Sequence, residues 1–169
     1  MTVSPAALPT RSHVQGSGQG RFPNVVGMPP PEIQVSIWVD PVVDARGHPA
    51  DSPYVEIFWL PVLGPSATFL LRRLSLYLDM FPEGLPMDLS ELSGQLGLGR
   101  PESRHAALPR AIDRCVRFGL ARRPGANRLA VRRILGPLPA QRVNRLSPFL
   151  QSIHADWADE PAGSVRPGR

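Results

Sequence analysis

The sequence contains no lysine, because all nineteen of its basic residues are arginine. A phosphate-binding P-loop and a Schiff-base enzyme both need a lysine, so neither chemistry is available to this chain. The single cysteine, Cys115, cannot form an internal disulfide, and no apolar run reaches the roughly 18 residues of a membrane-spanning helix. The first residues also lack the basic and then apolar order of a secretory signal. These absences predict a cytoplasmic protein that does not contact a membrane.

Catalytic and metal-binding patterns are absent as well. The four histidines, His13, His48, His105 and His154, are scattered without metal-ligand spacing, and no serine stands in a catalytic order with a histidine and an acid. Cys115 is expected to be a small buried hydrophobe, and an exposed pair is the default expectation for His154 and Asp156. The acidic group Asp40, Asp44 and Asp51 is typical of a solvated loop. We therefore predict no enzyme, no metal and no cofactor.

The positive charge is concentrated in one part of the chain. The formal net charge of the whole chain is +5. Between Asp88 and Leu146, twelve arginines stand against only four carboxylates, so this stretch alone carries +8. Such a local excess is typical of a domain that binds nucleic acid.

The N-terminal part divides into two segments. Residues 1–31 are rich in Pro, Gly and Ser and lack apolar periodicity, so we expect a disordered tail. Residues 32–63 are predicted to form a two-strand extension, with strands over 33–39 and 54–60, because both runs are rich in β-branched and aromatic residues. At the other end, residues 159–169 resemble a flexible tail.

From Gly64 onward the period of the apolar residues becomes helical. Ser66 is predicted to cap a helix that runs to about Tyr77 or Asp79. Its expected buried stripe consists of Phe69, Leu70, Leu74 and Leu78.

Two further helices and a hairpin are predicted to follow. Asp88 and Glu91 match a capping box at the start of a short helix with Leu89, Leu92 and Leu96 on its core face, and Gly97 and Gly99 match a left-handed end and turn. A third helix is predicted over about 106–118, with Pro109 in its first turn and Gly119 at its end. Short strands over 120–122 and 129–132, joined by a turn over 123–128, complete this segment.

The C-terminal segment, 136–158, is predicted to contain two short helices or one kinked helix, with a cap at Ser147 and Pro148. The aromatic residues Trp38, Phe58, Trp59 and Trp157 exceed what a domain of about 70 residues needs for its core. They are expected to supply core, and a dimer interface or partner-docking surface is the alternative.

Over residues 64–135 the chain resembles the winged helix-turn-helix superfamily, as found in many bacterial transcription regulators. The resembling runs are Leu-Ser-Glu-Leu-Ser-Gly-Gln-Leu-Gly-Leu-Gly (89–99) and Ala-Ile-Asp-Arg-Cys-Val-Arg-Phe-Gly-Leu-Ala-Arg (111–122). The resemblance implies a helix, a short helix, a glycine turn, a recognition helix and a two-stranded wing. The expected fold class is therefore mainly α with a small β component (α+β), built around this core.

The third helix has the two faces that a recognition helix needs. At about 100° per residue, Leu108, Ile112 and Cys115 fall on one side, while Arg110, Arg114 and Arg117 share a narrow arc on the opposite side. Such arginines present forked donors to guanine or phosphate. The alternative is an ordinary solvated face in a protein whose basic residues are all arginine. The predicted DNA-binding residues are Arg100, Arg104, Arg110, Arg114, Arg117, Arg122, Arg123, Arg128 and Arg132.

These observations predict a cytoplasmic, nucleoid-associated protein that binds double-stranded DNA as a transcriptional regulator. The alternative is a winged-helix module for protein interaction or assembly within a replication, partition or nucleoid complex. A homodimer or a protein partner would use the N-terminal strands and C-terminal helices.

Overall fold

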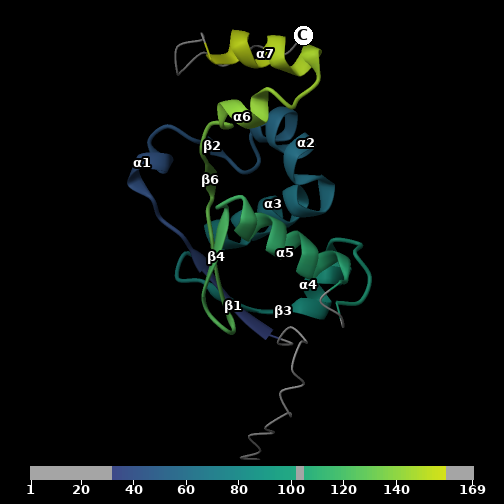
Figure 1. Cartoon of the computed structure of the whole chain (residues 1–169). Coiled ribbons are helices and arrows are strands. Elements are labelled where there is room, and N and C mark those ends of the chain that lie inside the picture. The colour runs from purple at the N-terminus through teal and green to yellow at the C-terminus, as the bar shows by residue number, and fades with distance from the viewer. Residues whose placement is uncertain (1–31, 102–104, 159–169) are drawn as a thin grey trace, which may run out of the picture.

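The computed structural model describes residues 32–101 and 105–158, which form a mixed α and β fold (Figure 1). The strands are β1 Glu32–Ile37, β2 His48–Pro49, β3 Leu85–Asp88, β4 Ala121–Gly125, β5 Arg128–Val131 and β6 Ile134–Leu135. The helices are α1 Pro41–Asp44, the π-helical η1 Val55–Trp59, α2 Leu60–Leu63, α3 Pro65–Met80, α4 Leu89–Gln95, α5 Ala107–Arg117, α6 Ala140–Val143 and α7 Pro148–Ala158. The predicted tails, 1–31 and 159–169, lie outside the described residues.

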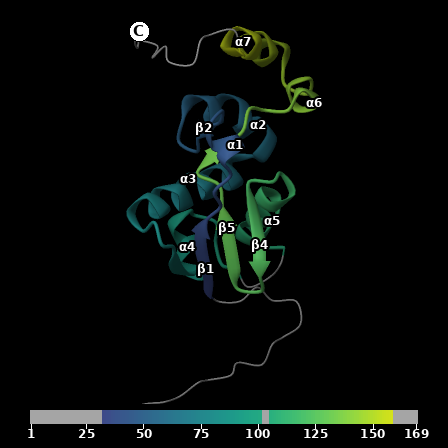
Figure 2. The same cartoon turned by 90° about the vertical axis from the view of Figure 1, so that its left-hand side faces the viewer.

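The main sheet has four strands in the order β3-β1-β5-β4. β1 lies antiparallel to β3 and parallel to β5, so that Gln34 is opposite Pro86 on one side and Arg128 on the other. The helices α3, α4 and α5 lie on one side of this sheet (Figures 1 and 2). A second sheet pairs β2 with β6.

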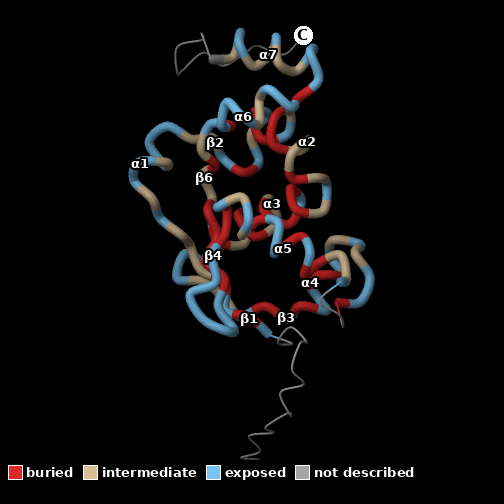
Figure 3. The backbone as a smooth tube through the Cα atoms, in the orientation of Figure 1, coloured by how far each residue is buried: buried red, intermediate tan, exposed pale blue. Residues whose placement is uncertain are grey.

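The hydrophobic core lies between the main sheet and these helices and continues toward α2 (Figure 3). Val35 of β1, Leu74 of α3, Leu92 of α4, Leu108 of α5 and Val131 of β5 are all fully or almost fully buried in it. Buried residues alternate with exposed ones along β1 and recur at helical spacing along α3. The sheet and the helices therefore each turn one apolar face to the core and form two layers.

Residues 54–60 are helical, so the predicted second strand and the two-strand extension are wrong. Tyr54, Val55, Phe58 and Trp59 are buried, and their spacing of three to four residues is that of a helix face. A short apolar run of this composition fits a buried strand and a buried helix equally well. The partners of β1 are instead β3 and β5, which come much later in the chain.

The longest helix, α3, differs from the prediction at two positions. It begins at Pro65 with Gly64 as its N-cap, and no side chain caps it, so the predicted Ser66 cap is wrong. Leu70, Leu74 and Leu78 are buried as expected, but Phe69 is 57% exposed. Phe69 therefore lies on the exposed face of α3 and is not part of the buried stripe.

The predicted helix boundaries around α4 are confirmed. The Asp88 carboxylate accepts a hydrogen bond from the amide of Glu91 at 2.8 Å, which is the first half of the predicted capping box. The second half is wrong, because the Glu91 carboxylate accepts from Gln95 Nε2 at 3.2 Å and not from the Asp88 amide. Gly97 and Gly99 have φ angles of +65° and +69°, the left-handed conformation expected after this helix. The next helix, α5, lies within the predicted range 106–118.

The hairpin after α5 is longer on one side than predicted. β4 continues to Gly125, which pairs with Arg128 at the tip, so residues 123–125 are strand and not turn. β5 ends at Val131, and this leaves Arg132 outside the hairpin.

The C-terminal segment forms two helices, as predicted, and packs on η1. Phe58 of η1 meets Trp157 of α7 edge-on at 5.7 Å between ring centroids, and Trp59 Nε1 donates to the carbonyl of Gly136 at 3.0 Å. Phe58 and Trp59 are core residues, whereas Trp38 and Trp157 are half-buried. None of the described helices is both long enough and apolar enough to span a membrane.

Candidate functional site

The α5 helix has one buried face and one basic exposed face. Leu108, Ile112 and Cys115 are buried against the rest of the protein. Arg110, Arg114 and Arg117 are all exposed on the opposite face, which is the arrangement that the helical spacing predicts. About one turn of the helix separates successive arginines, so the three side chains leave α5 from the same side of the helix.

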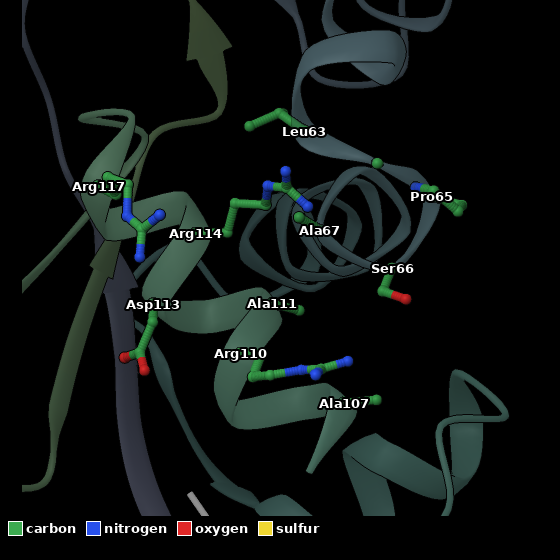
Figure 4. Close-up of a pocket in the computed structure, with 11 residues that line it drawn as sticks. Leu63, Pro65, Ser66, Ala67, Ala107, Arg110, Ala111, Asp113, Arg114 and Arg117 are labelled. Atoms are coloured by element: carbon green, nitrogen blue, oxygen red, sulfur yellow. The ribbon is translucent and has the colours of Figure 1, made fainter. Parts of the chain in front are cut away.

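An open groove of about 510 Å³ lies between this basic face and the start of α3. Its lining consists of Leu63, Gly64, Pro65, Ser66 and Ala67 on one side and Ala107, Arg110, Ala111, Asp113, Arg114 and Arg117 on the other. Arg110 and Arg114 extend from α5 toward the segment that carries Pro65 and Ser66 (Figure 4). The fold thus brings together three of the predicted site residues around one cavity.

The groove is strongly positive. Arg110, Arg114 and Arg117 form no ion pair with any residue in the ranges 32–101 and 105–158. The α3 helix begins at the same groove, where its first amides present the positive end of the helix dipole. The Arg114 guanidinium reaches the backbone here, since a Cβ built at Gly64 would lie in ordinary contact with Arg114 Nη1, at 3.5 Å. This concentration of positive charge favours an anion.

One carboxylate interrupts the basic surface. Asp113 lies on α5 between Arg110 and Arg114, and its Oδ1 accepts a hydrogen bond from Arg123 Nη2 of β4 at 2.7 Å. Both side chains are about half exposed. The pair connects α5 to the hairpin, so Arg123 already has a partner within the protein.

The hairpin carries two further exposed arginines. Arg122 and Arg128 are exposed, and the Arg122 guanidinium lies 4.9 Å from the centroid of the Trp38 ring. Arg100 is exposed in the connection between α4 and α5, whereas Arg104 lies outside the described residues.

Arg132 is not part of the exposed basic surface. Only 8% of its area is accessible, its Nε donates to the carbonyl of Gly119 at 2.9 Å, and its Nη2 binds Asp40 at 2.9 Å. Its guanidinium also lies 3.8 Å from the ring centroid of Trp38. These contacts join the end of the hairpin to the segment after β1. We therefore remove Arg132 from the set of candidate DNA contacts.

Two other residues have definite structural roles. Cys115 is buried, and burial raises the pKa of its thiol to about 12, as expected for a core cysteine. The prediction of an exposed pair between His154 and Asp156 is wrong, because His154 Nε2 lies 2.9 Å from the Tyr54 hydroxyl. No group of three or more residues within the described ranges could hold a metal ion.

The sequence did not indicate that the start of α3 borders the site, or that Asp113 pairs with the hairpin. The Gly64–Pro65–Ser66 run does mark a helix start, but nothing local indicates that this start faces α5. Asp113 stands among the arginines in the sequence, yet its pairing with Arg123 depends on the docking of the hairpin. Comparison with models of known families, with characterised proteins and with solved structures finds no match to this chain.

Proposed function

We propose that the chain binds duplex DNA, with α5 as the recognition helix and the β4–β5 hairpin as the wing beside it. The succession α3, β3, α4, α5, β4 and β5 follows the winged helix-turn-helix order that the sequence resembles. In this interpretation β1 is an addition, placed between β3 and β5 in the sheet. The biological role that fits best is regulation of transcription.

The observation that carries the proposal is the row of Arg110, Arg114 and Arg117 on the exposed face of α5. An α-helix with its side chains is about 10–12 Å across and fits the B-DNA major groove, which is about 12 Å wide. With eleven residues, α5 is roughly 16 Å long. Arginine binds guanine O6 and N7 through two donors and also binds phosphates. Arg122 and Arg128 of the wing would contact the backbone on one side of the helix.

The groove at the start of α3 suits the phosphate backbone. A DNA strand that follows α5 would place a phosphate between Arg110, Arg114 and the first amides of α3. This contact carries no sequence information, but it would fix the register of the helix on the duplex.

The test compares two double variants with the same loss of charge. Arg110→Ala/Arg114→Ala alters the groove, whereas Arg46→Ala/Arg145→Ala removes two exposed arginines elsewhere on the surface. Binding of a labelled generic duplex is measured by fluorescence anisotropy from about 50 to about 200 mM salt. We expect the groove variant to bind about 10- to 100-fold more weakly and to lose about 1.8 from the slope of log K against log salt concentration.

The control variant should keep most of the wild-type affinity. Equal weakening in both variants would mean that only net charge matters and that α5 has no special role. If the wild type does not bind duplex even at the lowest salt, the DNA proposal fails. The basic face should then be tested against acidic proteins, as the assembly-module alternative requires.

A further inference from the structure

The C-terminal helix α7 lies at one end of the molecule. It is the outermost helix at this end in Figures 1 and 2. No residue in the range 148–157 is buried, and Leu150, Ile153 and Trp157 are half-buried against the core. A peripheral helix with so little buried surface opens at a lower free energy than the elements that form the core.

A hydrogen bond joins His154 of α7 to Tyr54, which stands just before η1. The Tyr54 hydroxyl lies 2.9 Å from His154 Nε2 and accepts a hydrogen bond from the amide of Leu138, also at 2.9 Å. A hydroxyl has a single hydrogen to donate, and this one has no other acceptor within the ranges 32–101 and 105–158. The hydroxyl therefore donates to Nε2. His154 must accept at this nitrogen, so it is the neutral ring with its hydrogen on Nδ1.

The surroundings of His154 also favour the neutral ring. Phe58 is fully buried and meets the His154 ring edge-on, at 4.8 Å between centroids. His48 of β2 stacks on Tyr54 at 3.6 Å between centroids. Burial in this aromatic cluster lowers the pKa of both histidines, and a charge on His154 lowers the pKa of His48 further.

No ion pair within the described residues would compensate a positive charge on His154. The titratable groups of its cluster are Tyr54 and His48, and neither carries a negative charge at neutral pH. The charged residues of the neighbouring elements are engaged elsewhere or exposed, namely Glu56 with Arg72, Arg142 over Phe118, and Asp51, Arg145 and Asp156 in solvent.

We propose that protonation of His154 releases α7 from η1, so that the helix is an acid-sensitive cover over Tyr54 and Phe58. A protonated ring carries a hydrogen on Nε2 and cannot accept from the Tyr54 hydroxyl. Either that hydroxyl or the amide of Leu138 then loses its partner, although Tyr54 is only 3% exposed. In the released helix the protonated ring is hydrated and avoids this cost. This inference does not depend on DNA binding.

The direction of the pH effect follows from the two states of His154. In the released helix the ring has its ordinary pKa of about 6.5, whereas burial lowers the pKa in the docked helix. Opening therefore takes up a proton between these two values, and the opening constant rises by up to about tenfold for each pH unit in that interval. Above this interval α7 stays docked.

The first experiment measures amide hydrogen exchange of the full-length protein at about pH 7.5 and about pH 5.5, with rates corrected for the intrinsic effect of pH. We expect the amides of α7 to lose protection several-fold at the lower pH. Those of α3 and α5 should remain far more protected than α7 at both pH values, because the opening is local. Equal protection of the three helices would mean that α7 opens only when the whole chain unfolds, and this would overturn the proposal.

Matched glutamine variants assign the effect to one ring. In His154→Gln the side-chain oxygen can still accept from Tyr54 but does not titrate, so α7 should be equally protected at both pH values. His48→Gln removes the other titrating ring and leaves the bond between Tyr54 and His154, so it should keep the pH dependence of the wild type. The reverse pattern would assign the release to His48 and overturn the proposal. Circular dichroism of each variant checks the fold.

The tautomer of His154 gives a test that needs no substitution. Nitrogen chemical shifts of the ring at about pH 7.5 should show a hydrogen on Nδ1 and none on Nε2. A hydrogen on Nε2 would mean that His154 donates to Tyr54, so protonation would not break the bond. That result, or α7 protection in the wild type that is unchanged at about pH 5.5, would refute the proposal.

Discussion

The carboxylate of Asp113 on α5 binds the guanidinium of Arg123 on β4, with 2.7 Å between Oδ1 and Nη2. The two residues are ten positions apart, and the contact crosses from the recognition helix that we propose to the wing. Because both side chains are about half exposed, the pair stabilises the fold by no more than about 1 kcal/mol. Its larger effect is electrostatic, since it removes one positive charge from the proposed DNA surface.

Asp113→Asn is therefore expected to strengthen duplex binding. The variant loses a carboxylate that would repel phosphates and releases Arg123 for a backbone contact. We expect a several-fold higher affinity and a salt dependence steeper by about 0.9 in the log–log slope, both measured by anisotropy. Asp156→Asn on α7 is the control with the same charge change. An affinity that falls in Asp113→Asn would show that the pair orients the wing for binding.

Arg132→Ala is expected to reduce stability and not merely binding. The substitution removes the hydrogen bond to the Gly119 carbonyl, the contact with Asp40 and the stacking on Trp38. Loss of charged hydrogen bonds from a buried side chain predicts a free energy of unfolding lower by about 2–3 kcal/mol. Urea denaturation measures this value. Arg128→Ala, which removes an exposed arginine from the same hairpin, should change stability by less than about 0.5 kcal/mol.

The stability of the protein should decrease between about pH 7.5 and about pH 5.5. Burial lowers the pKa values of His48 and His154 from their ordinary value of 6.5, and a charge on His154 lowers the pKa of His48 further. Both rings contact Tyr54, which lies between them. The unfolded chain therefore binds more protons in this range, so acid favours unfolding.

The urea midpoint at the two pH values checks this expectation. In His48→Gln/His154→Gln the difference between the two midpoints should shrink, because the two titrating groups are gone. An unchanged difference would assign the acid sensitivity to other residues.

Cys115 should react only when the chain unfolds. The thiol is buried and its pKa is raised to about 12, so almost no thiolate exists at neutral pH. A thiol reagent such as Ellman's reagent should modify no cysteine in the native protein at pH 8, and one per chain in denaturant. Rapid modification of the native protein would show that α3 and α5 separate readily, because the sulfur contacts Ala67 of α3.

The sequence predicts the local structure better than the long-range contacts. Asp88, Gly97 and Gly99 mark the ends of α4 through their own backbone chemistry, and the faces of α5 follow from the helical period. The run over 54–60 is ambiguous because a fully buried helix and a fully buried strand are both apolar throughout. In the structure this run packs on segments distant in the sequence, such as α7, where Trp157 meets Phe58.

The same limit explains the errors at the candidate site. Phe69 and Leu70 are neighbours of similar polarity, and only the packing of the other elements on α3 decides which of them is buried. Arg132 and Arg128 are both basic residues of the hairpin region, but the first is buried against Trp38 and the second is exposed. The type of side chain alone does not predict which of these residues is buried.

The position of β1 has a consequence for synthesis of the protein. β1 is synthesised well before its parallel partner β5, with Gln34 opposite Arg128. Until β5 is made, β1 has only β3 as a strand partner, and one of its edges stays open. Helices α3 to α5 can pack before that point, so closure of the sheet is expected to be the late and slow step of folding.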